Sequence, residues 1–66
     1  MMEILLNGEK SQVPEGVSLA GLIENMKLEG PVAAMVNDHV IPRERLAATY
    51  LAPGDRVELL RMMGGG

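Results

Sequence analysis

The sequence predicts a small α+β domain in which a mixed β-sheet of four to five strands packs on one main helix. The chain has 66 residues, enough for one domain with a compact core. Several short segments alternate between apolar and polar residues, whereas only residues 19–26 repeat apolar residues at helical spacing. A helix with one apolar stripe needs one sheet face to cover it, so these observations favour two packed layers.

The chain begins with a predicted β-hairpin. Residues 2–6 place every second apolar side chain on one face, as in a half-buried strand. Asn7 and Gly8 both tolerate positive φ, which makes them a strong signal for a two-residue hairpin turn. The returning strand is predicted at residues 9–13, before Pro14.

Ser18 is the predicted N-cap of the helix, because its hydroxyl can accept a hydrogen bond from an unpaired N–H group of the first turn. The apolar stripe of this helix consists of Leu19, Leu22, Ile23 and Met26. We expect Met26 to fill the core. Gly30 and Pro31 are predicted to end the helix.

The second half of the chain is predicted to be mostly extended. Residues 32–37 form a strand, and residues 40–41 form a short edge piece. Residues 43–49 are compatible with either a helical turn or a loop. After a clear turn at residues 53–55, residues 56–61 form the last strand.

A hairpin, a helix and further strands in this order are typical of the β-grasp, or ubiquitin-like, architecture. In that architecture the last strand lies centrally in the sheet. Because this strand is predicted to end at residue 61, we divide the chain into a domain of residues 1–61 and a flexible Gly-rich tail of residues 62–66. The apolar residues predicted to face the helix are Ile4, Leu6, Val32, Ala34, Val36, Val57 and Leu59.

Composition excludes several functions. The net charge is −3, the six Lys and Arg residues are scattered, and Tyr50 is the one aromatic residue, which argues against nucleic acid as a partner. The absence of Cys excludes disulfides, thiolate metal sites and a cysteine nucleophile. His39 stands alone, and no nucleophile, base and acid form a set that would make the chain an enzyme. With no membrane segment or targeting signal in the sequence, we expect a cytoplasmic protein without a metal or cofactor of its own.

The sequence ends on Gly64, Gly65 and Gly66. Such a run packs nothing and is costly to order, so a folded domain has little use for it. A narrow end can instead thread into the active site of another protein. We interpret Gly66 as the residue that reacts and Gly64 and Gly65 as the part that threads. The simpler alternative is a frayed end or a cloning remnant, although such remnants usually include Ser or part of a tag.

The face of the sheet away from the helix is a candidate partner surface. Alternation places Leu5, Met35 and Leu60 on this face, and Met62 can extend it towards the tail. Arg61 can supply a charged contact at the root of the tail. The alternatives are scattered exposed apolar residues and a solvated arginine.

The chain also carries an ordered set of segments, each weak alone: ILLNG at 4–8, LAGLI at 19–23, VAAMVNDHVIPR at 32–43, LAPGD at 51–55 and VELL at 57–60, then the Gly-Gly end. With these segments the chain resembles, over nearly its whole length, the ThiS family of small sulfur carriers in thiamine (thiazole) biosynthesis. The resemblance implies a β-grasp fold and a terminal glycine carried as a thiocarboxylate. Two positions depart from the family pattern: Met35 stands where an acidic residue is common, and Asp38-His39 where Gly-Glu is common.

The resemblance also implies partners. An adenylating, E1-like enzyme, which holds ATP and magnesium, would activate the Gly66 carboxylate. A sulfur donor such as a cysteine desulfurase would supply the sulfur, and a thiazole synthase would receive it. The alternatives are a carrier like the small subunit of molybdopterin synthase, whose members are usually longer, a ubiquitin-like modifier and an interaction module with an inert tail.

Overall fold

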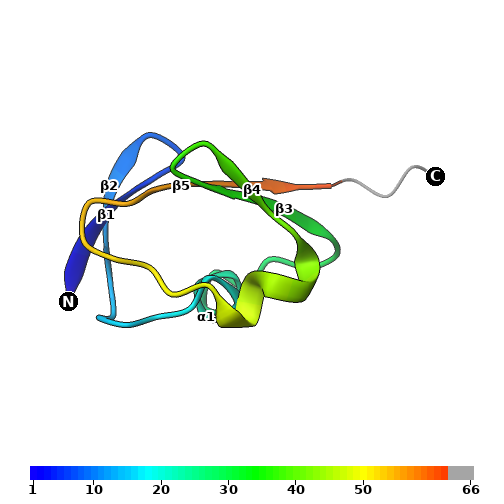
Figure 1. Ribbon diagram of the computed structural model, residues 1–66, viewed down its shortest axis with the longest axis horizontal. Helices are drawn as coiled ribbons and strands as arrows, with labels where there is room; N and C mark the ends of the chain where they lie inside the picture. Colours follow the sequence, from blue (N-terminus) through cyan, green and yellow to red (C-terminus); the bar gives the residue numbers. More distant parts are fainter. Residues whose placement is uncertain (63–66) are drawn as a thin grey trace.

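The structure, a computed structural model, describes residues 1–62 and confirms the predicted α+β class, with a mixed sheet packed on one main helix (Figure 1). The elements are β1 (Met2–Leu6), β2 (Glu9–Val13), α1 (Leu19–Asn25), β3 (Val32–Val36), β4 (His39–Ile41), the 3-10 helix η1 (Arg43–Ala48) and β5 (Arg56–Arg61). In Figure 1 the sheet forms one layer, while α1 and η1 lie together on one side of it.

The sheet contains five strands within the described residues, in the order β2-β1-β5-β3-β4. β1 and β5 are parallel, and the other neighbours are antiparallel. The last strand is therefore central, as the sequence predicted, and it leads directly to the C-terminal end of the molecule (Figure 1).

Two tight turns set the pairing of the hairpins. Asn7 (φ 50°) and Gly8 (φ 84°) join β1 to β2, which confirms the predicted turn. Asn37 (φ 49°) and Asp38 (φ 70°) join β3 to β4 in the same way. Positive φ at both central residues matches the twist of the flanking strands, so each turn closes a two-residue hairpin.

The helix begins as predicted but ends earlier. The Ser18 Oγ accepts a hydrogen bond from the Gly21 N–H group at 3.0 Å, which confirms the N-cap. The helix ends at Asn25, and Lys27 has a φ of 54°, so the chain leaves helical geometry before Gly30. The prediction that Met26 fills the core is therefore wrong: Met26 is 37% exposed because it lies beyond the last turn.

The core lies between the sheet and the helices. All seven residues predicted to face the helix are buried or packed against the core, which confirms the predicted faces of the strands. The buried core residues are Met2, Ile4, Val13, Leu19, Leu22, Ala34, Leu51, Val57 and Leu59. Residues 43–49, for which a helical turn and a loop were both open, contain the 3-10 helix η1.

No helix among residues 1–62 combines the length and the apolar character needed to cross a membrane.

Candidate functional site

The strand that leads to the glycine tail is held by β1 on one side. The Asn7 N–H group donates to the Val57 carbonyl at 2.8 Å. The Asn7 side chain then binds both backbone groups of Leu59: its Oδ1 accepts from the Leu59 N–H group at 2.9 Å, and its Nδ2 donates to the Leu59 carbonyl at 3.3 Å. Because β1 ends at Leu6, this side chain extends the parallel pairing with β5 beyond the end of the strand.

The antiparallel strand β3 holds the other side of β5 as far as Met62. Val32 lies opposite Arg61, and the Met62 N–H group donates to the Pro31 carbonyl at 2.9 Å. The chain is therefore hydrogen-bonded to the folded body up to the residue before the undescribed segment. The predicted reactive and threading residues, Gly64, Gly65 and Gly66, lie outside the described residues.

The structure brings some of the predicted surface residues together. Met35 and Leu60 occupy neighbouring positions on the outer face of the sheet, because Leu60 lies opposite Ala33 and Glu58 lies opposite Met35. Leu60 is 67% exposed and Met62 is 52% exposed. Met62 follows Leu60 by two residues in extended backbone, so both belong to the same face. These three residues form a row towards the root of the tail.

The other two predicted surface residues lie apart from this row. Leu5 is half-buried and sits opposite Arg56, so the charged side of β5 separates it from Met35. Arg61 is exposed at the end of β5, opposite Val32 and therefore on the inner side of the sheet. The register thus divides the predicted surface into an apolar row and two separate positions.

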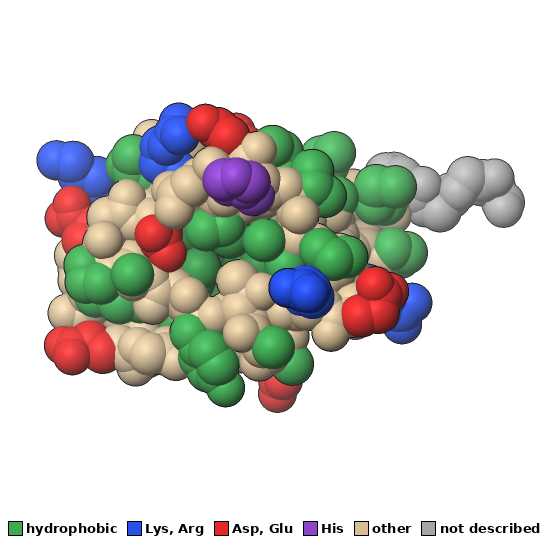
Figure 2. All heavy atoms as spheres, viewed as in Figure 1, with side chains coloured by type: hydrophobic (Ala, Val, Ile, Leu, Met, Phe, Trp, Pro, Cys, Tyr) green, Lys and Arg blue, Asp and Glu red, His purple; other side chains and the backbone are tan. Residues whose placement is uncertain are grey.

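Sequence reasoning missed two members of the apolar surface. Val40 is 71% exposed and lies opposite Met35, and Ala33 is exposed opposite Leu60. The signal for Val40 was present in the Asn37-Asp38 turn, since a two-residue hairpin sets the Met35–Val40 pair. Alternation along residues 32–36 places Ala33 on the same face as Met35. We call the four residues Ala33, Met35, Val40 and Leu60 the outer-face patch. In the side view of Figure 2, hydrophobic side chains gather towards the end of the molecule at which β5 ends.

The opposite end of β5 is polar. The Arg56 Nη2 lies 2.7 Å from the Asp38 Oδ2, and the Arg56 N–H group donates to the Asn37 Oδ1 at 2.9 Å. Both members of the ion pair are largely exposed, so the pair contributes at most about 1 kcal/mol. The outer face therefore changes from charged to apolar along β5, towards the tail.

Residues 1–62 contain no group of three or more His, Asp and Glu side chains that could hold a metal ion. What the described residues offer is a firmly held strand end beside an apolar surface. Such an arrangement can present a chain end to another protein.

Comparison with known proteins shows the family to which this chain belongs. The model of the ThiS family matches residues 2–66. The sulfur carrier protein ThiS of Escherichia coli (strain K12) is 30% identical over 66 residues, covering 98% of this chain and all of that protein. An uncharacterised protein, ycf40, of Porphyra purpurea is 29% identical, covering 98% of this chain and 93% of its own.

Two solved structures are similar to this chain in both sequence and fold. The crystal structure of a thiamine biosynthesis protein (ThiS) from Geobacter metallireducens is similar with a TM-score of 0.84 and 35% identity, covering 98% of this chain and 100% of its own. The solution structure of a thiamine biosynthesis protein from the same organism has a TM-score of 0.83 and the same identity, covering 98% of this chain and 88% of its own. The fold is therefore the predicted β-grasp, and the chain belongs to the ThiS family.

Proposed function

We propose that this chain, a ThiS-family sulfur carrier of thiamine biosynthesis, carries its sulfur as a thiocarboxylate on Gly66. The observation that carries the proposal is the extent of the family match, which runs from residue 2 to residue 66 and so includes the glycine end. The role is that of a protein co-substrate, because the chemistry is performed by the enzymes that receive the tail.

The chemistry follows from the carboxylate. A terminal carboxylate is ionised at neutral pH and is a poor acyl donor, because its leaving group would be oxide. Attack of a carboxylate oxygen on the α-phosphorus of ATP forms an acyl-adenylate and releases pyrophosphate. A sulfide sulfur then attacks the acyl carbon and AMP leaves, which gives the thiocarboxylate. When the donor is a persulfide, the acyl disulfide that forms must also be reduced by a thiol.

The tail is long and narrow enough to enter an active site while the folded domain stays outside it, and this supports the proposed role. The five residues 62–66 can span about 17 Å when extended, at roughly 3.4 Å a residue. Gly64 and Gly65 have no side chain that would widen the path or restrict φ and ψ. ATP and magnesium belong to the adenylating enzyme in this scheme, and the thiazole synthase and a sulfur donor such as a cysteine desulfurase complete it.

The outer-face patch is the surface that we assign to docking on these enzymes, with Met62 extending it. The patch is apolar, with Ala33, Val40 and Leu60 exposed and Met35 half-buried, and it lies along the strand that delivers the tail. Leu5 is separated from it by charged side chains, and Arg61 is available for a charged contact at the end of β5. Docking of the body would bring the tail to the catalytic site in one orientation.

The test is the intact mass of the protein. The full chain is incubated with its cognate adenylating enzyme, ATP, magnesium and sulfide, and we expect the mass increase that replaces one oxygen atom by sulfur. A reaction without ATP and a variant that lacks Gly66 are the controls, and neither should gain mass. No gain with an enzyme that forms the acyl-adenylate would contradict the proposal. An isopeptide adduct on a lysine would indicate a modifier instead.

A further inference from the structure

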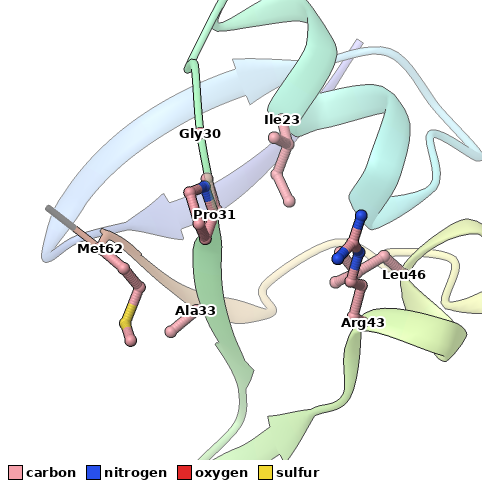
Figure 3. Close-up of a pocket in the computed structure, with 8 residues that line it drawn as sticks. Ile23, Gly30, Pro31, Ala33, Arg43, Leu46 and Met62 are labelled. Atoms are coloured by element: carbon pink, nitrogen blue, oxygen red, sulfur yellow. The ribbon is translucent and has the colours of Figure 1, made fainter. Parts of the chain in front are cut away.

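A groove of about 650 Å³ opens between the N-terminal end of β3 and the helices α1 and η1. Its walls include Ile23 of α1, Arg43 and Leu46 of η1, Pro31, Val32 and Met62. Figure 3 shows Arg43 and Leu46 on one side, Pro31 and Ala33 on the other, and Ile23 projecting from the helix between them. We call this space the edge groove. Its size is within the range of about 300–1,000 Å³ typical of sites that bind ligands.

The edge groove contains an uncovered edge of the sheet. β4 pairs only with Ala34–Val36 of β3, because Pro42 follows β4 and the chain turns into η1. Successive residues of an antiparallel ladder direct their backbone groups to opposite edges. Pro31 binds Met62 of the central strand, so the N–H and C=O groups of Val32 point the other way, towards the uncovered edge. Within residues 1–62 no backbone hydrogen bond joins Val32 to Pro42 or to η1.

The chemistry of the walls indicates what would fit. Ile23 and Leu46 are partly buried and packed against the core, so they offer fixed apolar contacts. Arg43 is the charged side chain among the residues that line the groove, and no ion pair within the described part of the chain includes it. A complementary occupant has free backbone groups, apolar side chains and a carboxylate.

Position and composition select a partner protein over a second copy of this chain. Met62 lines the groove and is the first residue of the tail, so the groove is continuous with the segment that, in the proposed function, enters other proteins. A second copy could offer its edge strand β2, whose residues Glu9–Gln12 are all polar, or its three-residue edge strand β4, in which Ile41 already packs against its own core and no residue is acidic. Neither strand offers both apolar side chains for the walls and a carboxylate for Arg43.

We propose that the edge groove binds a short extended segment of a partner protein, in which apolar residues are flanked by aspartate or glutamate. The segment adds a strand beside Val32, packs its apolar side chains on Ile23 and Leu46, and places a carboxylate at Arg43. This inference goes beyond sulfur transfer, since no step of that chemistry uses the groove.

The experiment is a titration of the full 15N-labelled chain, followed by NMR, with an acetylated and amidated Asp-Val-Ile-Val-Asp peptide at low salt. We expect shifts at Val32, Ile23 and Leu46, and slower hydrogen exchange of the Val32 N–H group. A Lys-Val-Ile-Val-Lys peptide is the matched probe and should bind about fivefold more weakly, as one exposed charge pair allows.

Two variants separate the effect of the Arg43 charge on peptide binding from any effect on folding. Arg43→Glu should reverse the preference between the two peptides. Arg45→Glu makes the same change in charge on η1, at an exposed residue that does not line the groove, and should keep the preference. Unchanged spectra away from the substituted residue would confirm that each variant is folded.

Several results would overturn the proposal. These are unchanged exchange at Val32 in the presence of the peptide, shifts confined to Met35, Val40 and Leu60 or to β2, and an unaltered preference in Arg43→Glu. Shifts that depend on protein concentration without peptide would assign the groove to a second copy. Stronger peptide binding after removal of residues 63–66 would assign it to the chain's own end. The titration uses no ATP and no enzyme, so its failure leaves the test of sulfur transfer standing.

Discussion

Asn7 binds both backbone groups of Leu59, a residue 52 positions later in the chain. The same residue forms the β1–β2 turn with a φ of 50°. One side chain therefore joins the N-terminal hairpin to the strand that leads to the tail. It supplies β5 with the hydrogen bonds that β1 would have made had it continued.

Asn7→Ala should lower the free energy of unfolding by about 1–3 kcal/mol, because partly buried backbone groups of Leu59 lose their partners and alanine disfavours positive φ. Urea denaturation measures the change. Asn7→Gly separates the causes, since glycine accepts the φ and still lacks the side chain. Asn25→Ala, at an exposed position at the end of α1, is the control and should stay within about 0.5 kcal/mol of the parent. Equal stability of Asn7→Gly and the parent would show that the bonds to Leu59 contribute nothing.

Ser18→Ala should cost about 1 kcal/mol, because the first turn of α1 loses the 3.0 Å hydrogen bond that caps it. Thermal unfolding checks this against Ser11→Ala. The Ser11 hydroxyl donates to the Glu9 carbonyl at an exposed position, so its removal should have little effect. If both variants unfold at one temperature, the cap does not stabilise the domain.

Gly54→Ala should destabilise the domain through its backbone alone. Gly54 has a φ of 84°, and no atom lies within 4 Å of a Cβ placed there. The expected cost is about 1–2 kcal/mol, the penalty for a side chain in left-handed geometry. Gly54→Asn should cost less, because asparagine tolerates this region. Comparable stability of Gly54→Ala and the parent in urea would mean that the turn changes its conformation at no cost.

Leu19→Ala should lower the free energy of unfolding by about 2–5 kcal/mol, because Leu19 is 0% exposed and its truncation leaves a cavity between α1 and the sheet. Leu60→Ala removes the same atoms from a residue that is 67% exposed, so it should change stability little. Equilibrium denaturation of the two variants compares the same substitution at a buried and at an exposed position. A loss of similar size in both would place Leu60 in the core.

Substitution of the outer-face patch should separate docking from stability. Val40→Ser and Leu60→Ser together should raise the KM of the adenylating enzyme for this chain several-fold, while the urea midpoint stays near that of the parent. Tyr50→Ser is the control, because Tyr50 is 69% exposed and lies outside the patch. If Tyr50→Ser raises the KM as much as the double variant does, the patch has no specific role in docking.

Local sequence determined much of this protein. The Asn7-Gly8 pair selects a tight hairpin because both residues accept positive φ, and the alternation in residues 56–61 sets which side of β5 is buried. The order of the elements was sufficient to predict a central last strand. The ordered segments and the glycine end, which are read from the sequence alone, indicate the ThiS family.

The tertiary structure alone decided how distant residues share a surface. Pairing of β3 with β5 puts Glu58 beside Met35, and the early end of α1 at Asn25 leaves Met26 exposed. The uncovered edge at Val32 exists because β4 is shorter than β3. The alternation of apolar and polar residues predicts on which face of its own strand a side chain lies. Register and strand length depend on hydrogen bonds between segments far apart in the chain, which no local pattern contains.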